Sequence, residues 1–159
     1  MKKLILTVLA VCLGAACIGP LPQVPTLGDV QLPPTQGEEI WMAENYNGKP
    51  VLIVFMGSWC PWCKKTIPAL NQIGEKYGNQ IEVVGAFMDQ TPGPVNDVSA
   101  EHGLNVKTLF NASEVAEGLG VEGLPHAILF DKKHRAIKIW EGYNPSFAEE
   151  FDQQVKRVL

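Results

Sequence analysis

The sequence predicts an α/β fold, in which a central mixed sheet is flanked by helices. Three short apolar runs are typical of buried strands, and they are residues 51–56, 81–87 and 126–130. A stretch with helical periodicity, 60–77, separates the first two runs and supplies the crossover that two parallel strands need. The third run is joined to residues 136–140 by a polar turn, which predicts an antiparallel hairpin. The sheet should therefore hold both parallel and antiparallel strands.

Two of the expected helices are amphipathic. The first is 60–77, and Gly78 ends it. The second is capped by Ser146 and runs to Leu159 at the end of the sequence. The apolar faces of the two helices consist of Ile67, Leu70, Ile73 and Tyr77 in the first, and of Phe147, Phe151, Val155 and Val158 in the second.

Shorter elements are expected elsewhere along the chain. Residues 38–46 form a short strand or a helix, and periodicity does not decide between them. A glycine and proline cluster over 90–94 breaks the chain, and a short helix follows over 96–102. Residues 106–110 predict a further strand, and Ser113 is expected to cap a helix that ends at residue 119.

Residues 1–16 are typical of a secretion signal. Two lysines precede an apolar run over 4–13, which is shorter than the roughly 20 residues of a bilayer span. Small residues then lead to Cys17, and this junction resembles the lipobox of bacterial lipoproteins, whose cysteine becomes a lipidated N-terminus. The alternative is ordinary cleavage after a small residue, which gives an exported protein without lipid.

Residues 17–37 are rich in proline and predict an extended spacer in front of a domain over 38–159. The sequence is also compatible with part of this spacer packing along the domain as an edge strand. The net charge of −4 provides no electrostatic footprint for nucleic acid.

A C-x-x-C pair, Cys60 and Cys63, stands where the first buried strand gives way to a helix. A sulfur at a helix N-terminus faces unpaired backbone N–H groups and the positive end of the helix dipole, which stabilise a thiolate. Pro61 suits the first turn, where no N–H is needed. Cys63 lies one turn further on the same face and can reach the first sulfur. The spacing predicts Cys60 as the attacking thiolate and Cys63 as the resolving thiol.

Two structural explanations of the pair are weaker. A permanent disulfide across C-x-x-C closes a very small loop and therefore stabilises little. A tetrahedral zinc site needs more ligands, and the sequence has no second C-x-x-C or nearby Cys/His pair. We therefore expect no metal and no other cofactor. Trp59 is expected to belong to the core and the wall of the site, and Trp62 to provide a substrate platform.

Three motifs carry a family resemblance: Gly48-Lys49-Pro50-Val51-Leu52 leading to Trp59-Cys60-x-x-Cys63, Pro68 within the helix, and Gly123-Leu124-Pro125 before a strand. On these motifs, residues 38–159 resemble the thioredoxin superfamily. The resemblance is greater to its exported, membrane-anchored TlpA/ResA-like branch, which includes reductases of cytochrome c maturation.

The resemblance implies that Pro125 is cis and lies beside the cysteines, so that the backbone of Leu124 pairs with an incoming substrate strand. Two acids common in the family are absent. Val54 replaces a buried Asp of many thioredoxins, and Thr66 replaces a Glu of several exported reductases. The sequence therefore does not identify the group that exchanges the proton of the resolving thiol, and water and His126 are the candidates.

The predicted function is that of an exported thiol–disulfide oxidoreductase that reduces disulfides of extracytoplasmic proteins, for example during cytochrome c maturation. The Pro-Trp pair between the cysteines resembles oxidase sites, so an oxidase or isomerase is the alternative. A copper-binding chaperone is less favoured. We expect protein thiol and disulfide clients, a membrane or periplasmic electron-transfer partner, and a monomer in the periplasm or cell envelope, anchored by lipidated Cys17.

Overall fold

The computed structural model describes residues 25–159, and its main sheet has five strands in the order β5-β4-β3-β6-β7. The strands are β3 (Val51–Met56), β4 (Glu82–Phe87), β5 (Lys107–Leu109), β6 (His126–Phe130) and β7 (Ala136–Glu141). The neighbours β3, β4 and β5 pair in parallel, whereas β6 is antiparallel to both β3 and β7. The predicted mixed sheet is confirmed.

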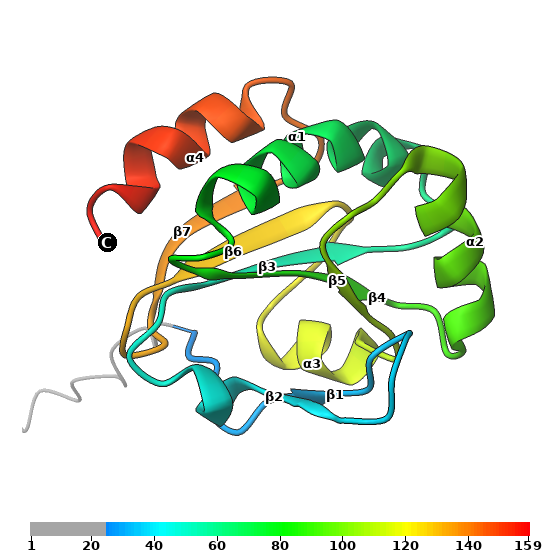
Figure 1. Ribbon diagram of the computed structural model, residues 1–159, viewed down its shortest axis with the longest axis horizontal. Helices are drawn as coiled ribbons and strands as arrows, with labels where there is room; N and C mark the ends of the chain where they lie inside the picture. The colour runs from blue at the N-terminus through cyan, green and yellow to red at the C-terminus, as the bar shows by residue number, and fades with distance from the viewer. Residues whose placement is uncertain (1–24) are drawn as a thin grey trace, which may run out of the picture.

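Helices cover both faces of this sheet (Figure 1). One face carries α1 (Pro61–Tyr77), α2 (Pro92–His102) and α4 (Phe147–Val155), and the other carries α3 (Ser113–Gly118) and the N-terminal segment. Side chains alternate along a strand, so Leu52 and Val54 of β3 join the first core while Ile53 and Phe55 join the second. Because every residue of β3 is buried, the loop that follows it starts from a fixed position.

The segment 25–37, the described part of the predicted spacer, packs against the domain. Its strand β1 (Gln31–Leu32) pairs antiparallel with β2 (Trp41–Met42). Leu27 and Leu32 are only 1% and 2% exposed. Their burial offsets the cost of ordering a proline-rich segment. The packed part of the chain thus begins ahead of residue 38, and the predicted signal and Cys17 lie outside the described residues.

Two helix boundaries differ from the predictions. Helix α2 begins at Pro92, within the supposed breaker cluster, because a proline in the first turn of a helix costs no hydrogen bond. Helix α4 ends at Val155, before residue 159. The undecided stretch 38–46 contains both alternatives, since β2 is followed by a 3₁₀ turn over Ala43–Tyr46.

Of the two predicted serine caps, the one at Ser113 is wrong and the one at Ser146 is confirmed in position. The residue that precedes α3 is Ala112, and Ser113 is already the first residue of the helix. Ser146 does precede α4, but its side chain makes no capping hydrogen bond. Among the described residues 25–159, no helix combines the length and the apolar character required to cross a membrane.

Candidate active site

The two cysteines of the C-x-x-C pair lie at the start of α1. Cys60 is the N-cap residue, with extended backbone at φ −86° and ψ 112°, and Pro61 occupies the first turn. The Cys63 backbone N–H donates to Cys60 Sγ at 3.2 Å. This bond satisfies one of the N–H groups that a helix start leaves open. Both cysteines are free thiols.

The two sulfurs differ in their surroundings. Cys60 is 8% exposed and Cys63 only 1%. Burial, together with the hydrogen bond to Cys60, raises the pKa of the Cys63 thiol well above its usual range. Cys63 therefore stays protonated at neutral pH, whereas Cys60 is the sulfur that another molecule reaches first.

The chain before β6 forms the second wall of the site. The Leu124–Pro125 peptide bond is cis, as predicted. The Cys60 thiol donates to the Leu124 carbonyl oxygen at a sulfur–oxygen distance of 3.9 Å. Residues separated by more than sixty positions in the sequence thus meet at Cys60 Sγ.

A buried carboxylate that the sequence analysis missed holds the loop before Cys60. Asp89 is 7% exposed and accepts two hydrogen bonds from Ser58, from the backbone N–H at 3.0 Å and from Oγ at 2.6 Å. Because β3 and β4 are parallel, the residues that follow them meet at one edge of the sheet. The sequence did contain a signal for this residue, because Asp89 is a polar residue just after β4, the strand that pairs with β3.

Aromatic side chains form an exposed rim around the cysteines. Trp59 and Trp62 are 61% and 52% exposed. Tyr143, which the sequence analysis did not single out, stacks on Trp62 with ring centroids 5.6 Å apart. Lys65 Nζ lies 4.2 Å from the centroid of the Trp62 ring. These contacts connect the start of α1 with the loop between β7 and α4.

The expectation that Trp59 belongs to the core is wrong. Its ring lies so close to Gly57 that a Cβ added there would come within 2.8 Å of it. The indole thus lies close to the backbone of Gly57, while Trp59 as a whole stays largely exposed. This leaves the ring available to a docking partner.

The residues considered for the proton route of Cys63 lie on opposite faces of the sheet. Val54 and Thr66 line a cavity of about 10 Å³ beside Pro125, close to the volume that holds one water molecule. His126 is 4% exposed, and burial lowers its pKa. Strand alternation places its side chain with Phe55 on the face opposite Cys63. The small cavity lies on the same face of the sheet as Cys63, but neither cysteine lines it.

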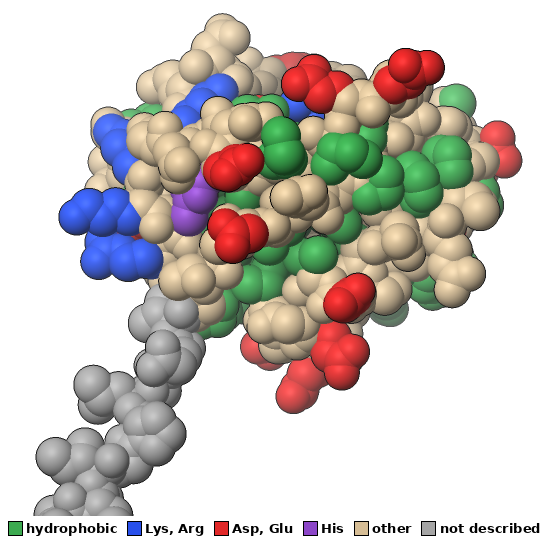
Figure 2. All heavy atoms as spheres, turned by 90° about the horizontal axis from the view of Figure 1, so that it is seen from below, with side chains coloured by type: hydrophobic (Ala, Val, Ile, Leu, Met, Phe, Trp, Pro, Cys, Tyr) green, Lys and Arg blue, Asp and Glu red, His purple; other side chains and the backbone are tan. Residues whose placement is uncertain are grey.

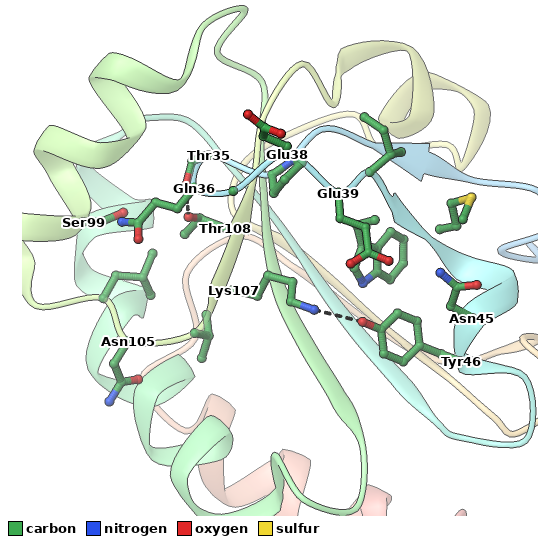
Figure 3. A pocket seen from close by; sticks show the side chains of 17 residues that line it. Thr35, Gln36, Glu38, Glu39, Asn45, Tyr46, Ser99, Asn105, Lys107 and Thr108 are labelled. Atoms are coloured by element: carbon green, nitrogen blue, oxygen red, sulfur yellow. Dashed lines mark hydrogen bonds between the residues drawn. The ribbon is translucent and has the colours of Figure 1, made fainter.

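A much larger cavity, of about 700 Å³, lies between the N-terminal segment and β5 (Figure 3). Neither cysteine lines it. Lys107 lines this cavity, and its Nζ donates to Tyr46 Oη at 2.9 Å and to Glu82 Oε1 at 3.0 Å. These contacts tie the segment around β2 to the sheet, so we assign the cavity a structural role.

Comparison with known proteins agrees with this arrangement. Residues 25–139 match the model of the AhpC/TSA family. The chain belongs to this family. It is 26% identical over 125 residues to the thiol-disulfide oxidoreductase ResA of Bacillus thuringiensis, covering 77% of this chain and 70% of that protein. It is 28% identical over 140 residues to YkuV of Bacillus subtilis, also named a thiol-disulfide oxidoreductase, covering 80% of this chain and 93% of that protein.

Solved structures show the same fold. A protein from Chlorobium tepidum assigned as the thiol:disulfide interchange protein DsbE superposes with a TM-score of 0.77 at 24% identity, covering 87% of this chain and 98% of that one. The exposed lipoprotein thioredoxin Etrx1 of Streptococcus pneumoniae superposes with a TM-score of 0.66 at 24% identity, covering 81% and 98%. The thioredoxin-like fold and the class of thiol–disulfide oxidoreductase predicted from the sequence are confirmed.

Proposed function

We propose that this protein reduces disulfides of exported client proteins, with Cys60 as the attacking sulfur and Cys63 as the resolving one. The observation that carries the roles of the two sulfurs is the bond from the Cys63 N–H to Cys60 Sγ at the start of α1, and the likeness to ResA supports the reducing direction. Cys60 lies at the start of the helix, where an approaching sulfur meets it first, while burial raises the pKa of Cys63 and keeps it as a thiol. The two sulfurs thus have the different surroundings that the two steps of exchange require.

In the first step, Cys60 Sγ attacks one sulfur of a client disulfide. A Cys60–client S–S bond forms, the client S–S bond breaks, and the released client thiolate takes a proton from water. In the second step, Cys63 loses its proton and attacks Cys60 Sγ. The Cys60–Cys63 disulfide forms, and the second client sulfur leaves as a thiolate and is protonated. The client gains two electrons and two protons, and the pair becomes oxidised.

Clients approach the rim formed by Trp59 and Trp62, with Leu124 behind it. The Leu124 carbonyl oxygen lies within reach of Cys60 Sγ, so an extended client segment paired with that backbone would bring its disulfide to the sulfur. Exposed indoles provide contact area that tolerates many client sequences.

A dithiol partner in the membrane or periplasm must return two electrons to the oxidised pair. We place the protein in the cell envelope, held by lipidated Cys17, because the sequence before the described residues has the features of a lipoprotein signal. Apocytochrome c is the client class we favour, because the cysteine and proline motifs resemble a branch that includes reductases of cytochrome c maturation.

The experiment that tests the roles is trapping. Cys63→Ala should accumulate mixed disulfides with client proteins, because the resolving sulfur is gone, and digestion followed by mass spectrometry should place every adduct on Cys60. Cys60→Ala should lose exchange altogether. Turnover by the Cys60→Ala protein at the rate of the unsubstituted protein would contradict the assignment.

One observation favours the isomerase alternative. The raised pKa of Cys63 keeps the resolving thiol protonated, which prolongs the mixed disulfide that an isomerase uses to rearrange a client. Refolding of a scrambled multi-disulfide protein separates the two functions. A reductase leaves it reduced, whereas an isomerase restores its native disulfides.

A further inference from the structure

Four basic side chains gather at the β6–β7 turn and the end of α4. They form the basic patch, which we define as Lys132, Lys133, Arg135 and Arg157. All four are exposed. The patch is notable because the protein as a whole is acidic, with a net charge of −4. Figure 2 shows Lys and Arg side chains concentrated at the edge of the molecule where the described chain begins.

The patch combines charge with apolar surface. It borders an open depression of about 430 Å³ that is also lined by Ile137 and Val158, and Ile137 is 43% exposed. The neighbouring acid, Asp131, is paired with Arg135 through a hydrogen bond of 2.7 Å from Nη2 to Oδ2. Lys132 Nζ donates to the Leu159 carbonyl oxygen at 2.6 Å, so Lys133 and Arg157 carry most of the positive charge that the patch presents to solvent. Basic side chains around exposed apolar ones suit the interface of an anionic membrane.

The patch and the cysteines lie at opposite ends of the sheet. In the antiparallel pair of β3 and β6, Phe55 faces His126 at the end next to Cys60, and Val51 faces Phe130 at the end next to the turn. The strand between these two ends is about 15 Å long at roughly 3.3 Å per residue. A membrane bound to the patch would therefore leave the cysteines facing away from it.

The described chain starts beside the patch. The Ala136 N–H donates to the Pro25 carbonyl oxygen at 2.8 Å, and Thr26 bridges to Arg135. Only residues 18–24 separate Pro25 from Cys17. This stretch spans at most about 28 Å when fully extended, at roughly 3.5 Å per residue. A lipid on Cys17 would thus hold the patch close to the headgroups and raise its effective concentration there.

We propose that the basic patch binds the anionic phospholipid surface on which the protein is anchored, and so directs the cysteine site toward the aqueous phase. The proposal rests on the lipid anchor of the proposed function for its orientation. The contact itself needs only the patch, and it can be measured without the lipid. The occupant is a membrane because the apolar side chains, the positive charge and the position of Pro25 occur on the same face.

The test measures binding of the full chain carrying Cys17→Ser, which cannot be lipidated, to vesicles of phosphatidylcholine with and without phosphatidylglycerol. We expect tighter binding to the anionic vesicles and weaker binding as salt rises. In the same background, Lys133→Gln with Arg157→Gln should weaken binding about 25-fold, or roughly fivefold per charge removed. Arg135 is left in place because it stabilises the turn through Asp131.

The matched control is Lys64→Gln with Lys65→Gln, which removes the same charge at the cysteine end of the molecule and should leave vesicle binding unchanged. Equal losses in the two variants, or no preference for anionic vesicles, would overturn the proposal. Absence of vesicle binding, with cross-linking of an acidic envelope protein through Lys133→Cys, would also overturn it and place a protein on the patch. Insulin reduction by the Cys17→Ser protein and by its Lys133→Gln/Arg157→Gln variant tests the proposed function separately, so the two can fail independently.

Discussion

Cys60 and Cys63 are separated by one helical turn, yet their sulfurs have different surroundings. The first accepts a backbone N–H at 3.2 Å and has slight exposure, whereas the second is 1% exposed. A thiolate is stabilised by backbone dipoles and penalised by burial, so the same helix start makes one sulfur a nucleophile and keeps the other as a thiol. The order of attack follows from this contrast.

The contrast predicts an unusual pH dependence for the resolving step. The pKa of Cys63 is raised, so its reactive thiolate is a minor form that grows about tenfold with each pH unit below that pKa. Burial is the largest cause of this shift and does not depend on a free Cys60 thiol, so the rate at which a Cys60 mixed disulfide resolves should keep rising beyond about pH 9, where a cysteine of ordinary pKa would level off. Stopped-flow measurement of release from a preformed mixed disulfide checks this. A plateau near pH 8 would contradict it.

Asp89 acts on the cysteine only through Ser58, so we regard it as a positioning residue. Asp89→Asn removes the charge and one of the two acceptors used by Ser58, and should lower the free energy of unfolding by about 1.5–3 kcal/mol. It should also slow alkylation of Cys60 at neutral pH. Urea unfolding and iodoacetamide kinetics measure the two effects.

The control for this prediction is a double-mutant cycle with Ser58→Ala. The effect of Asp89→Asn should be much smaller in that background, because the partner hydroxyl is already gone. Additive effects of the two substitutions would show that Asp89 does not act through Ser58.

At the scale of elements, a substitution in the N-terminal segment tests whether β1 belongs to the fold. Leu32→Ala should lower the free energy of unfolding by about 2–5 kcal/mol, because Leu32 is 2% exposed within the core that includes Ile53 and Phe55. The exposed neighbour Gln31 provides the control, since Gln31→Ala should change stability by less than about 0.5 kcal/mol. If both substitutions changed the free energy of unfolding by the same small amount, the prediction would be contradicted and the segment would be a loosely attached spacer.

The elements that the sequence predicted well are those whose signal is local. The run over 51–56 is buried at every position, and the helix over 61–77 has a clear apolar face. Segment 25–37 gave no such signal, because two leucines among prolines have no periodicity. Asp89 was missed for a related reason: its partner Ser58 lies 31 residues away, and only the parallel pairing of β3 and β4 brings them together.

At the scale of the whole molecule, the two ends of the sheet carry different features. The cysteines and their aromatic rim lie at one end of the sheet, and Pro25, where the described chain starts, lies at the other. The lipid anchor that we propose ahead of Pro25 would therefore present Cys60 to clients in the aqueous phase. The same arrangement allows a soluble dithiol domain to approach the oxidised pair from that side.

The most direct test of the central claim is the midpoint potential of the Cys60–Cys63 pair, measured by equilibration with dithiol buffers and alkylation of free thiols. A client reductase should show one two-electron transition near the value of thioredoxin, about −270 mV. A transition near about −120 mV, typical of a strong oxidant, or no transition at all, would contradict the account.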